Sequence, residues 1–176
     1  MELETPRLIL RPFTEADAAD LYDYARRPQV GPAAGWQPHR DEAESLRVIR
    51  EIFQPSNSLA VVLKQTGRVI GSAGYVDRHR EELPGPDDEI GYSLSPDYWG
   101  QGLIPEAVRE ILRYGFEELG LNTQWCAHYA GNEKSRRVIE KCGFRYRFTQ
   151  RGWVEAMEEE RDELYYALTR EEWERR

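Results

Sequence analysis

The segment from Glu89 to Tyr129 predicts a strand, a long helix and a second strand, and this unit restricts the fold more than any other feature. Residues 89–94 and 123–129 have the composition of strands, and apolar residues recur at helical spacing between 104 and 119. Two strands joined by a crossover helix lie parallel in one sheet. The chain is therefore expected to contain at least one parallel strand pair.

The remaining segments predict antiparallel partners for this unit. Strands are expected at about 7–13, 58–64, 68–76, 145–153 and 161–168, and helices at about 14–27, 41–53, 132–142 and 169–173. Thr14 is the expected N-cap of the first helix. The helix at 41–53 is expected to bury one apolar face, made of Ala43, Leu46, Ile49, Ile52 and Phe53. The fold class expected is α/β, with one domain over residues 1–176 and a mixed, mostly antiparallel sheet covered by helices on both faces.

Bulk properties exclude several classes of protein. The chain has 176 residues, of which 40% are hydrophobic and 32% charged, so it can form a core and does not resemble a disordered tail. Its apolar runs are too short to cross a bilayer, and its N-terminus lacks the basic and apolar regions of a signal peptide, which predicts a cytoplasmic protein. Cys126 and Cys142 are expected to be buried free thiols rather than a disulfide or metal site.

The net charge of −8 argues against a nucleic acid or an anionic membrane as a partner. It suits a cationic acceptor such as an amine, or it serves solubility alone.

A turn containing two glycines connects the strand at 89–94 to the long helix. Its sequence is Tyr98-Trp99-Gly100-Gln101-Gly102. A helix that begins at such a turn presents unpaired backbone N–H groups at the positive end of its dipole, where phosphates bind. The common nucleotide motifs GxGxxG and GxxxxGK[ST] are absent. An ordinary helix cap with flexible glycines is the alternative.

A second informative segment follows the strand at 123–129. Asn132 is a natural helix N-cap, and Ser135 lies one turn later on the same face of the helix. Capping explains Asn132 as well as ligand contact does. Val138, Ile139 and Cys142 are expected in the core, and Gly143 is expected to end the helix.

The two segments together resemble the GNAT superfamily, especially the bacterial branch that includes the ribosomal-protein alanine and serine N-acetyltransferases. The matching features occur in order and span essentially the whole chain. They are Thr5-Pro6-Arg7-Leu8-Ile9-Leu10-Arg11-Pro12, the strand from Glu89 to Leu94, Tyr98 to Gly102, Asn132-x-x-Ser135, and Lys141-x-Gly143-Phe144.

The resemblance implies acetyl-CoA as cosubstrate, with its pantetheine arm in a gap beside the strand at 89–94. Backbone N–H groups near Tyr92, Ser93 and Leu94 would then polarise the thioester carbonyl. The pyrophosphate would be bound by the turn and the first helical residues, namely Trp99, Gly100, Gln101, Gly102, Leu103 and Ile104. The superfamily pattern here is Q/R-x-x-G-x-G/A. This chain keeps the central Gly102 but has Trp99 at the first position and Ile104 at the last, and Pro105 has no N–H.

The resemblance also implies catalytic roles. Glu89 is the candidate general base, and a surface or salt-bridged carboxylate beside Asp87 and Asp88 is the alternative. Many members place a general-acid tyrosine where this chain has Ile139, so Ser135 becomes the candidate donor to the leaving thiolate. Asn132 would help orient the cofactor. The expected reaction is direct acetyl transfer, in a ternary complex, to the primary amine of a protein N-terminus or a small molecule. A non-catalytic acyl-CoA-binding module is the alternative.

The acceptor site is expected at the loop from Gly31 to His39. Trp36 and His39 are its candidate recognition groups; alternatively, Trp36 packs beneath the loop and His39 is exposed. The histidines show no familiar metal-ligand spacing, and the reaction needs no metal. Superfamily members are often homodimers, and the C-terminal strands offer an edge for such pairing.

Overall fold

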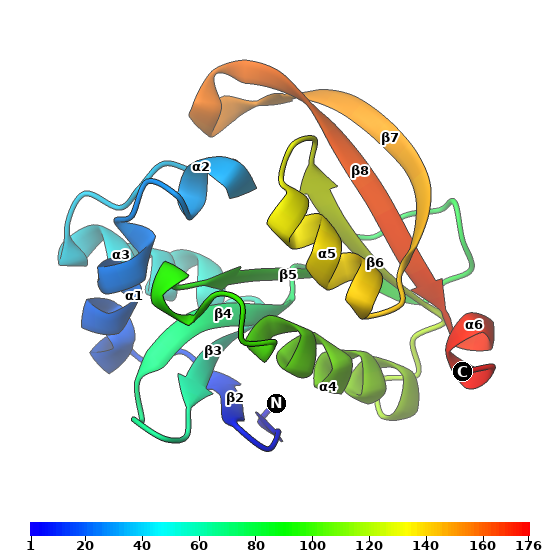
Figure 1. Ribbon diagram of the computed structural model, residues 1–176, viewed down its shortest axis with the longest axis horizontal. Coiled ribbons are helices and arrows are strands. Elements are labelled where there is room, and N and C mark those ends of the chain that lie inside the picture. Colours follow the sequence, from blue (N-terminus) through cyan, green and yellow to red (C-terminus); the bar gives the residue numbers. More distant parts are fainter.

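The computed structural model describes residues 1–176 and contains one eight-stranded sheet (Figure 1). Its strands are β1 (Leu3–Glu4), β2 (Leu8–Pro12), β3 (Asn57–Leu63), β4 (Val69–Tyr75), β5 (Asp87–Leu94), β6 (Thr123–Tyr129), β7 (Arg145–Val154) and β8 (Glu159–Thr169). Their spatial order is β1-β2-β3-β4-β5-β6-β8-β7. Only β5 and β6 pair in parallel, and every other pair is antiparallel. The expected mixed, mostly antiparallel sheet is confirmed.

Helices cover both faces of the sheet, as expected (Figure 1). They are α1 (Ala18–Ala25), α2 (Gly31–Ala34), α3 (Glu42–Val48), α4 (Leu103–Glu117), α5 (Glu133–Lys141) and α6 (Arg170–Glu174). The main core joins α4 and α5 to one face of the central strands. A second cluster packs α1 and the segment after α3 against the other face. Burial of apolar side chains on both faces is the main force that holds this arrangement together.

Local signals placed most of these elements correctly. Thr14 precedes a short 3-10 turn that continues into α1, and it forms a capping box with Asp17. Gly143 follows α5 with a φ of 88°, the left-handed conformation that a glycine adopts without steric cost. Cys126 in β6 and Cys142 at the end of α5 are both buried free thiols, as expected.

The segment 41–53 differs from its prediction. It divides into α3 and a π-helical turn, Ile49–Phe53, rather than forming one regular helix. A π turn has more residues per turn than an α-helix and therefore rotates the residues after it out of phase. Ile49 is buried as expected, but Ile52 within the π turn is 56% exposed. Ala43, in the first turn of α3 before the π turn, is also exposed. The short elements β1 and α2 were not predicted, because two- and four-residue segments carry no periodicity.

Gly115 on α4 is required by close packing, and its substitution tests the interface between α4 and the sheet. A Cβ atom there would lie 2.0 Å from the Tyr75 hydroxyl and 2.5 Å from Nε2 of Gln124. That hydroxyl donates to the carbonyl of Ile111 at 3.0 Å and contacts Oε1 of Gln124 at 2.6 Å. We expect Gly115→Ala to destabilise the fold by about 1–3 kcal/mol. Thermal unfolding measures this, with Gly152→Ala as control because nothing lies within 4 Å of the added atom. An unchanged midpoint for Gly115→Ala would contradict the packing described.

None of the helices is both long enough and apolar enough to span a membrane.

Candidate active site

The only parallel strand pair separates part of the way along its length. Asp87 to Glu89 of β5 pair with Thr123 to Trp125 of β6. Beyond Glu89, β5 continues to Leu94 and β6 continues to Tyr129, and the two strands have no further pairing. A gap therefore opens in the sheet at Glu89, on the side of β5 that faces β6.

The hydrogen bonds between β4 and β5 determine which backbone groups face this gap. In an antiparallel ladder, alternate residues direct their N–H and C=O groups toward the partner strand and away from it. The N–H of Val76 donates to the carbonyl of Glu89 at 3.0 Å. The N–H of Ser95 donates to the carbonyl of Ile70 at 2.8 Å. The backbone N–H and C=O groups of Glu89, Gly91 and Ser93 therefore point toward β4.

The alternate residues Ile90, Tyr92 and Leu94 direct their backbone groups away from β4 and into the gap. Of the three residues expected to polarise a thioester carbonyl, Tyr92 and Leu94 have this orientation, and the amide of Ser93 faces β4. The Ser93 side chain lies on the opposite face from Tyr92, where its hydroxyl is 2.8 Å from that of Ser72. The gap therefore offers the amides of Tyr92 and Leu94 as donors.

The start of α4 provides a run of unpaired donors beside β5. No backbone N–H from Gly100 to Ile104 donates a hydrogen bond, whereas that of Trp99 donates to the carbonyl of Pro96. Gly100 and Gly102 have φ values of 78° and 73°. These left-handed conformations explain the glycines, since other residues adopt them at a cost. Five consecutive amides at the positive end of a 15-residue helix could hold an anion, and they form the candidate anion site.

The acidic residue in the first turn of α4 leaves these amides unoccupied. The Glu106 carboxylate instead accepts from the Thr5 hydroxyl at 2.6 Å and from the backbone N–H of Arg7 at 2.9 Å. Its other oxygen pairs with Nε of Arg7 at 2.7 Å. The N-terminal segment therefore holds Glu106 away from the anion site.

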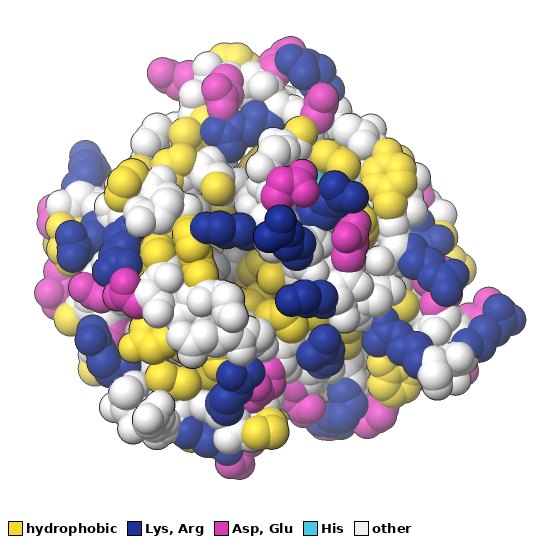
Figure 2. Space-filling model, in the orientation of Figure 1, with side chains coloured by type: hydrophobic (Ala, Val, Ile, Leu, Met, Phe, Trp, Pro, Cys, Tyr) yellow, Lys and Arg dark blue, Asp and Glu magenta, His cyan; other side chains and the backbone are white.

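Basic residues concentrate near this site although the whole chain has a net charge of −8. Figure 2 shows Lys and Arg side chains over the region of α5, beside a hollow floored by hydrophobic side chains. The Nζ atom of Lys134 in α5 lies 3.4 Å from the centre of the Trp99 ring. Trp99 in turn donates from Nε1 to the carbonyl of Leu94 at 3.1 Å. Trp99 therefore connects the turn before α4 with the start of α5.

Ser135 has a hydroxyl partner that the sequence analysis did not identify. The Tyr92 hydroxyl lies 2.7 Å from Oγ of Ser135 and 3.2 Å from its carbonyl oxygen. Burial raises the pKa of Tyr92 well above its usual value, so this phenol is neutral and available as a donor. Tyr92 was predicted to contribute only its backbone, because sequence spacing does not show that side chains 43 residues apart will meet.

Asn132 acts as the N-cap of α5. Its Oδ1 accepts from the backbone N–H of Ser135 at 3.3 Å, and its Nδ2 donates to the carbonyl of Ala33 at 3.3 Å. The first bond fixes the start of the helix, and the second connects it to α2. These contacts support the capping interpretation directly.

Glu89 lies at the origin of the gap, and its side chain is only 6% exposed. Burial raises the pKa of this carboxyl, while the positive charges of Arg78 and Arg80 oppose the rise. Arg78 is 3.6 Å from one carboxylate oxygen and Arg80 is 3.5 Å from the other. The salt-bridged alternative is thus partly realised, but the carboxylate is not on the surface. The raised pKa suits a group that accepts a proton near neutral pH.

The two arginines were also missed by the sequence analysis. They lie in the segment between β4 and β5, where the residue pattern is not periodic. The pairing of Val76 with Glu89 places the residues that follow β4 next to Glu89. The predicted antiparallel neighbours could have indicated this proximity.

Trp36 and His39 lie against each other, with ring centres 5.3 Å apart, and both are partly buried. Trp36 packs beneath the loop, where a Cβ on Gly31 would lie 2.5 Å from its ring. His39 is not exposed: its Nδ1 is 2.7 Å from the Ser45 hydroxyl, and burial lowers its pKa. Trp36 is thus held by packing, and His39 by a hydrogen bond to α3.

Tyr129 connects this loop to the neighbourhood of Glu89. A Cβ on Gly35 would lie 2.8 Å from the Tyr129 ring. Trp125 is the register partner of Glu89, and Tyr129 lies four residues further along β6, so the side chains of Glu89 and Tyr129 are on the same face of the sheet. The loop therefore borders the same face of the sheet as Glu89.

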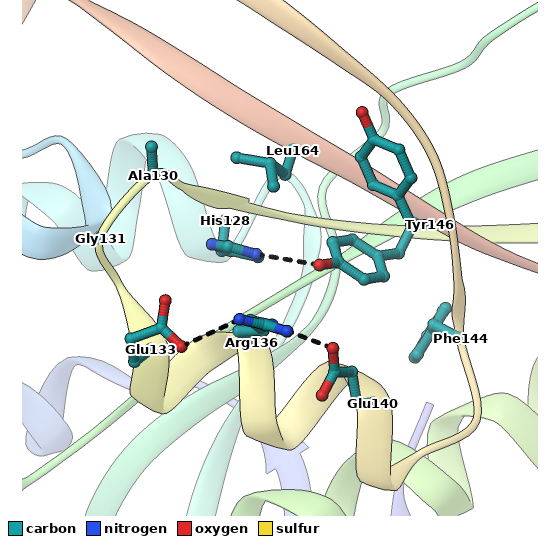
Figure 3. Close-up of a pocket in the computed structure, with 10 residues that line it drawn as sticks. His128, Ala130, Gly131, Glu133, Arg136, Glu140, Phe144, Tyr146 and Leu164 are labelled. Carbon is teal, nitrogen blue, oxygen red and sulfur yellow. Dashed lines mark hydrogen bonds and ion pairs between the residues drawn. The ribbon is translucent and has the colours of Figure 1, made fainter.

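A pocket of about 600 Å³ lies elsewhere, between α5 and the β7–β8 ribbon (Figure 3). His128, Tyr146 and Tyr166 contribute to its lining. Arg136 in this pocket is already paired with Glu133 at 3.3 Å and with Glu140 at 3.0 Å. Glu133, Arg136 and Glu140 lie on the side of α5 opposite Ser135, so the helix itself separates the pocket from the gap.

Substitution of Gly102 tests the anion site. We expect Gly102→Val to weaken CoA binding at least about tenfold, because a β-branched residue disfavours the left-handed conformation that aligns the amides. Gly120→Val is the matched control, since Gly120 has a φ of 72° against 73° for Gly102 and lies beyond the other end of α4. Calorimetric titration with CoA measures the affinity of each variant. Thermal unfolding measures the destabilisation that the left-handed backbone conformation causes in both variants. Equal CoA affinity in both variants would remove this turn from the binding site.

Comparison with known proteins is consistent with this geometry. Residues 7–145 match the model of the acetyltransferase (GNAT) domain. The uncharacterized N-acetyltransferase p20 of Bacillus licheniformis is 28% identical over 178 residues, covering 97% of each chain. The [ribosomal protein uS5]-alanine N-acetyltransferase of Escherichia coli (strain K12) is 24% identical over 185 residues, covering 98% of this chain and 93% of that one. An acetyltransferase (GNAT family) from Bacillus anthracis has the same fold, with a TM-score of 0.84 at 24% identity and coverage of 97% and 99%.

Proposed function

The chain belongs to the GNAT family of N-acetyltransferases, and from this premise we propose that it transfers the acetyl group of acetyl-CoA directly to a primary amine. Acetyl-CoA is the general cosubstrate of the family. The observation that most supports its use by this chain is the run of five unpaired amides from Gly100 to Ile104 beside the gap. These amides suit the pyrophosphate of acetyl-CoA, and the basic side chains over α5 suit its remaining phosphate group.

In the proposed reaction, the amides of Tyr92 and Leu94 act on the thioester carbonyl. Donors directed at an oxygen that gains negative charge stabilise the transition state more than the ground state. These two amides are fixed by the pairing of β5 with β4 and need not reorganise. The superfamily resemblance and the orientation of the two amides support this assignment.

Glu89 is the proposed base. A primary alkylamine has a pKa of about 10 and is mostly protonated at neutral pH, so it must lose a proton before it attacks. Glu89 accepts that proton, directly or through water. The new carbon–nitrogen bond then forms, the carbon–sulfur bond breaks, and the second proton lost by the nitrogen passes to the departing thiolate or to water.

Ser135 is the proposed donor to the departing sulfur. For its proton to be available, the single Tyr92 hydroxyl proton must go to Oγ of Ser135 at 2.7 Å and not to the Ser135 carbonyl at 3.2 Å. A serine hydroxyl is a weak acid, so a hydrogen bond to the thiolate is the role assigned. Asn132 supports it by fixing the first turn of α5.

Calorimetric titration with acetyl-CoA and with CoA tests the cosubstrate, and thiol release in the presence of amines tests the reaction. We expect micromolar binding, about −8 kcal/mol, and release of CoA that depends on the amine. Binding without turnover for any amine would favour the non-catalytic acyl-CoA-binding module. A folded protein that binds neither ligand would contradict both functions.

A further inference from the structure

The carboxylate of Glu89 is flanked by two guanidinium groups that do not bind it closely. Arg78 and Arg80 approach its two oxygens at 3.6 and 3.5 Å. Charge-assisted hydrogen bonds between such groups usually measure about 2.7–2.9 Å. Elsewhere in the molecule arginines reach these distances: Arg147 contacts the two oxygens of Glu172 at 2.8 and 2.7 Å. The donors around Glu89 are thus largely unused.

Arg80 is the more unusual of the two. Its side chain is only 16% exposed, and its guanidinium lies 3.7 Å from the centre of the Tyr165 ring. Its Nε is buried without a hydrogen-bond partner, and the 3.5 Å contact with Glu89 is the only polar contact of its side chain. A guanidinium has five donors, and leaving buried donors unpaired is unfavourable. A ligand that accepts from Arg80 would relieve this.

Arg78 provides an approach to the cluster from solvent. Its side chain is 61% exposed, whereas that of Glu89 is 6% exposed. Its guanidinium has no partner closer than Glu89. A small molecule can therefore meet Arg78 first and Glu89 next.

The arrangement of charge disfavours a simple alkylammonium acceptor. Such a cation beside Glu89 would lie within a few ångströms of two positive charges, and their repulsion is strong where water is excluded. Carboxylates also lie nearby: the backbone N–H of Arg80 donates to Asp87 at 2.8 Å, and the charge of Glu163 acts on Glu89. A cluster that presents both signs fits a ligand that carries both signs.

We propose that the acceptor is a small zwitterionic amine, whose ammonium approaches Glu89 and whose carboxylate or phosphate binds Arg78 and Arg80. This inference rests on the proposed function and specifies its substrate class. Because both guanidiniums lie close to the same carboxylate, the amine and the anion of the acceptor must be near each other. A free amino acid or an aminoalkyl phosphate satisfies this condition, whereas the N-terminal residue of a protein has no free α-carboxylate.

Matched pairs of acceptors test the proposal on the wild-type enzyme. L-Alanine is compared with L-alaninamide, 2-aminoethyl phosphate with ethanolamine, and an amidated peptide beginning with alanine represents protein substrates. We expect kcat/KM at least about tenfold higher for the anionic member of one pair, an effect of the size usual for a charged hydrogen bond. The pair that shows the preference identifies the anion.

Variants then distinguish ligand binding from a structural role. Arg80→Gln should reduce the preference for the anionic acceptor to about twofold or less, whereas Arg80→Lys should retain part of it. Arg113→Gln, on α4 and paired with Glu110 and Glu117, is the control and should leave the preference unchanged.

Three results would overturn the proposal: equal kcat/KM within each pair, equal loss for both members in Arg80→Gln, or no acetylation of any of these amines by protein that binds acetyl-CoA. Lack of acetyl-CoA binding would instead refute the proposed function itself. Calorimetry on the same sample keeps the two failures distinct.

Discussion

Ser135→Ala is expected to lower kcat by about 10- to 100-fold while the KM for acetyl-CoA stays nearly unchanged. A hydrogen bond to a charged group contributes about 1.5–3 kcal/mol. The sulfur is charged only as it leaves, so the bond from Ser135 acts on the transition state and not on binding. Steady-state kinetics with saturating amine measures the two constants separately. An unchanged kcat would remove Ser135 from the reaction.

Tyr92→Phe extends this test to the second hydroxyl. Its loss is expected to lower kcat by a smaller factor, about three- to tenfold, because Tyr92 acts by orienting Ser135 through a single neutral hydrogen bond. The double variant should be hardly slower than Ser135→Ala alone, since coupled residues are not additive. Tyr146→Phe is the control, because that hydroxyl is exposed and contacts only Thr149. Additive losses would show that the two hydroxyls act independently.

The arrangement of the sheet could be predicted because it depends on local signals and one topological rule. The strand–helix–strand unit required a parallel pair, and the structure has its one parallel pair at β5 and β6. Turn and cap residues then placed most of the other boundaries. These signals do not contain the separation of β5 and β6. The resemblance implied a gap beside the strand at 89–94, and the register shows that pairing ends at Glu89.

The surroundings of the candidate site were predicted less well, since they depend on contacts between distant segments. Tyr92 was predicted for its backbone, yet its side chain extends to Ser135 on another element. Arg78 and Arg80 were not predicted at all. Trp36 and His39 contact Gly31 and Ser45 in the structure, and their role in recognising the acceptor stays a prediction. Residue type indicates which groups can react, and only the packing shows which groups meet.

Glu89→Gln is expected to lower kcat/KM by about 100-fold or more near neutral pH, the usual contribution of a positioned base. The pH profile is more specific than the rate. Burial raises the pKa of Glu89 from its ordinary value near 4.5, so the carboxylate is protonated, and lost as a base, when the pH falls through that raised value. Wild-type kcat/KM should therefore show an acid limb with an apparent pKa above 4.5.

That limb should disappear in Glu89→Gln, whose remaining pH dependence follows the deprotonation of the amine itself, with a pKa of about 10. Asp88→Asn is the matched control, because burial also raises the pKa of this adjacent carboxyl. If the limb persists in Glu89→Gln and vanishes in Asp88→Asn, then Asp88 is the titrating group and Glu89 is not the base. If it persists in both variants, neither carboxylate accepts the proton, and the free amine must be drawn from solution. The pH profile thus measures how far burial raises the pKa of Glu89 against the opposing charges of the two arginines that flank it.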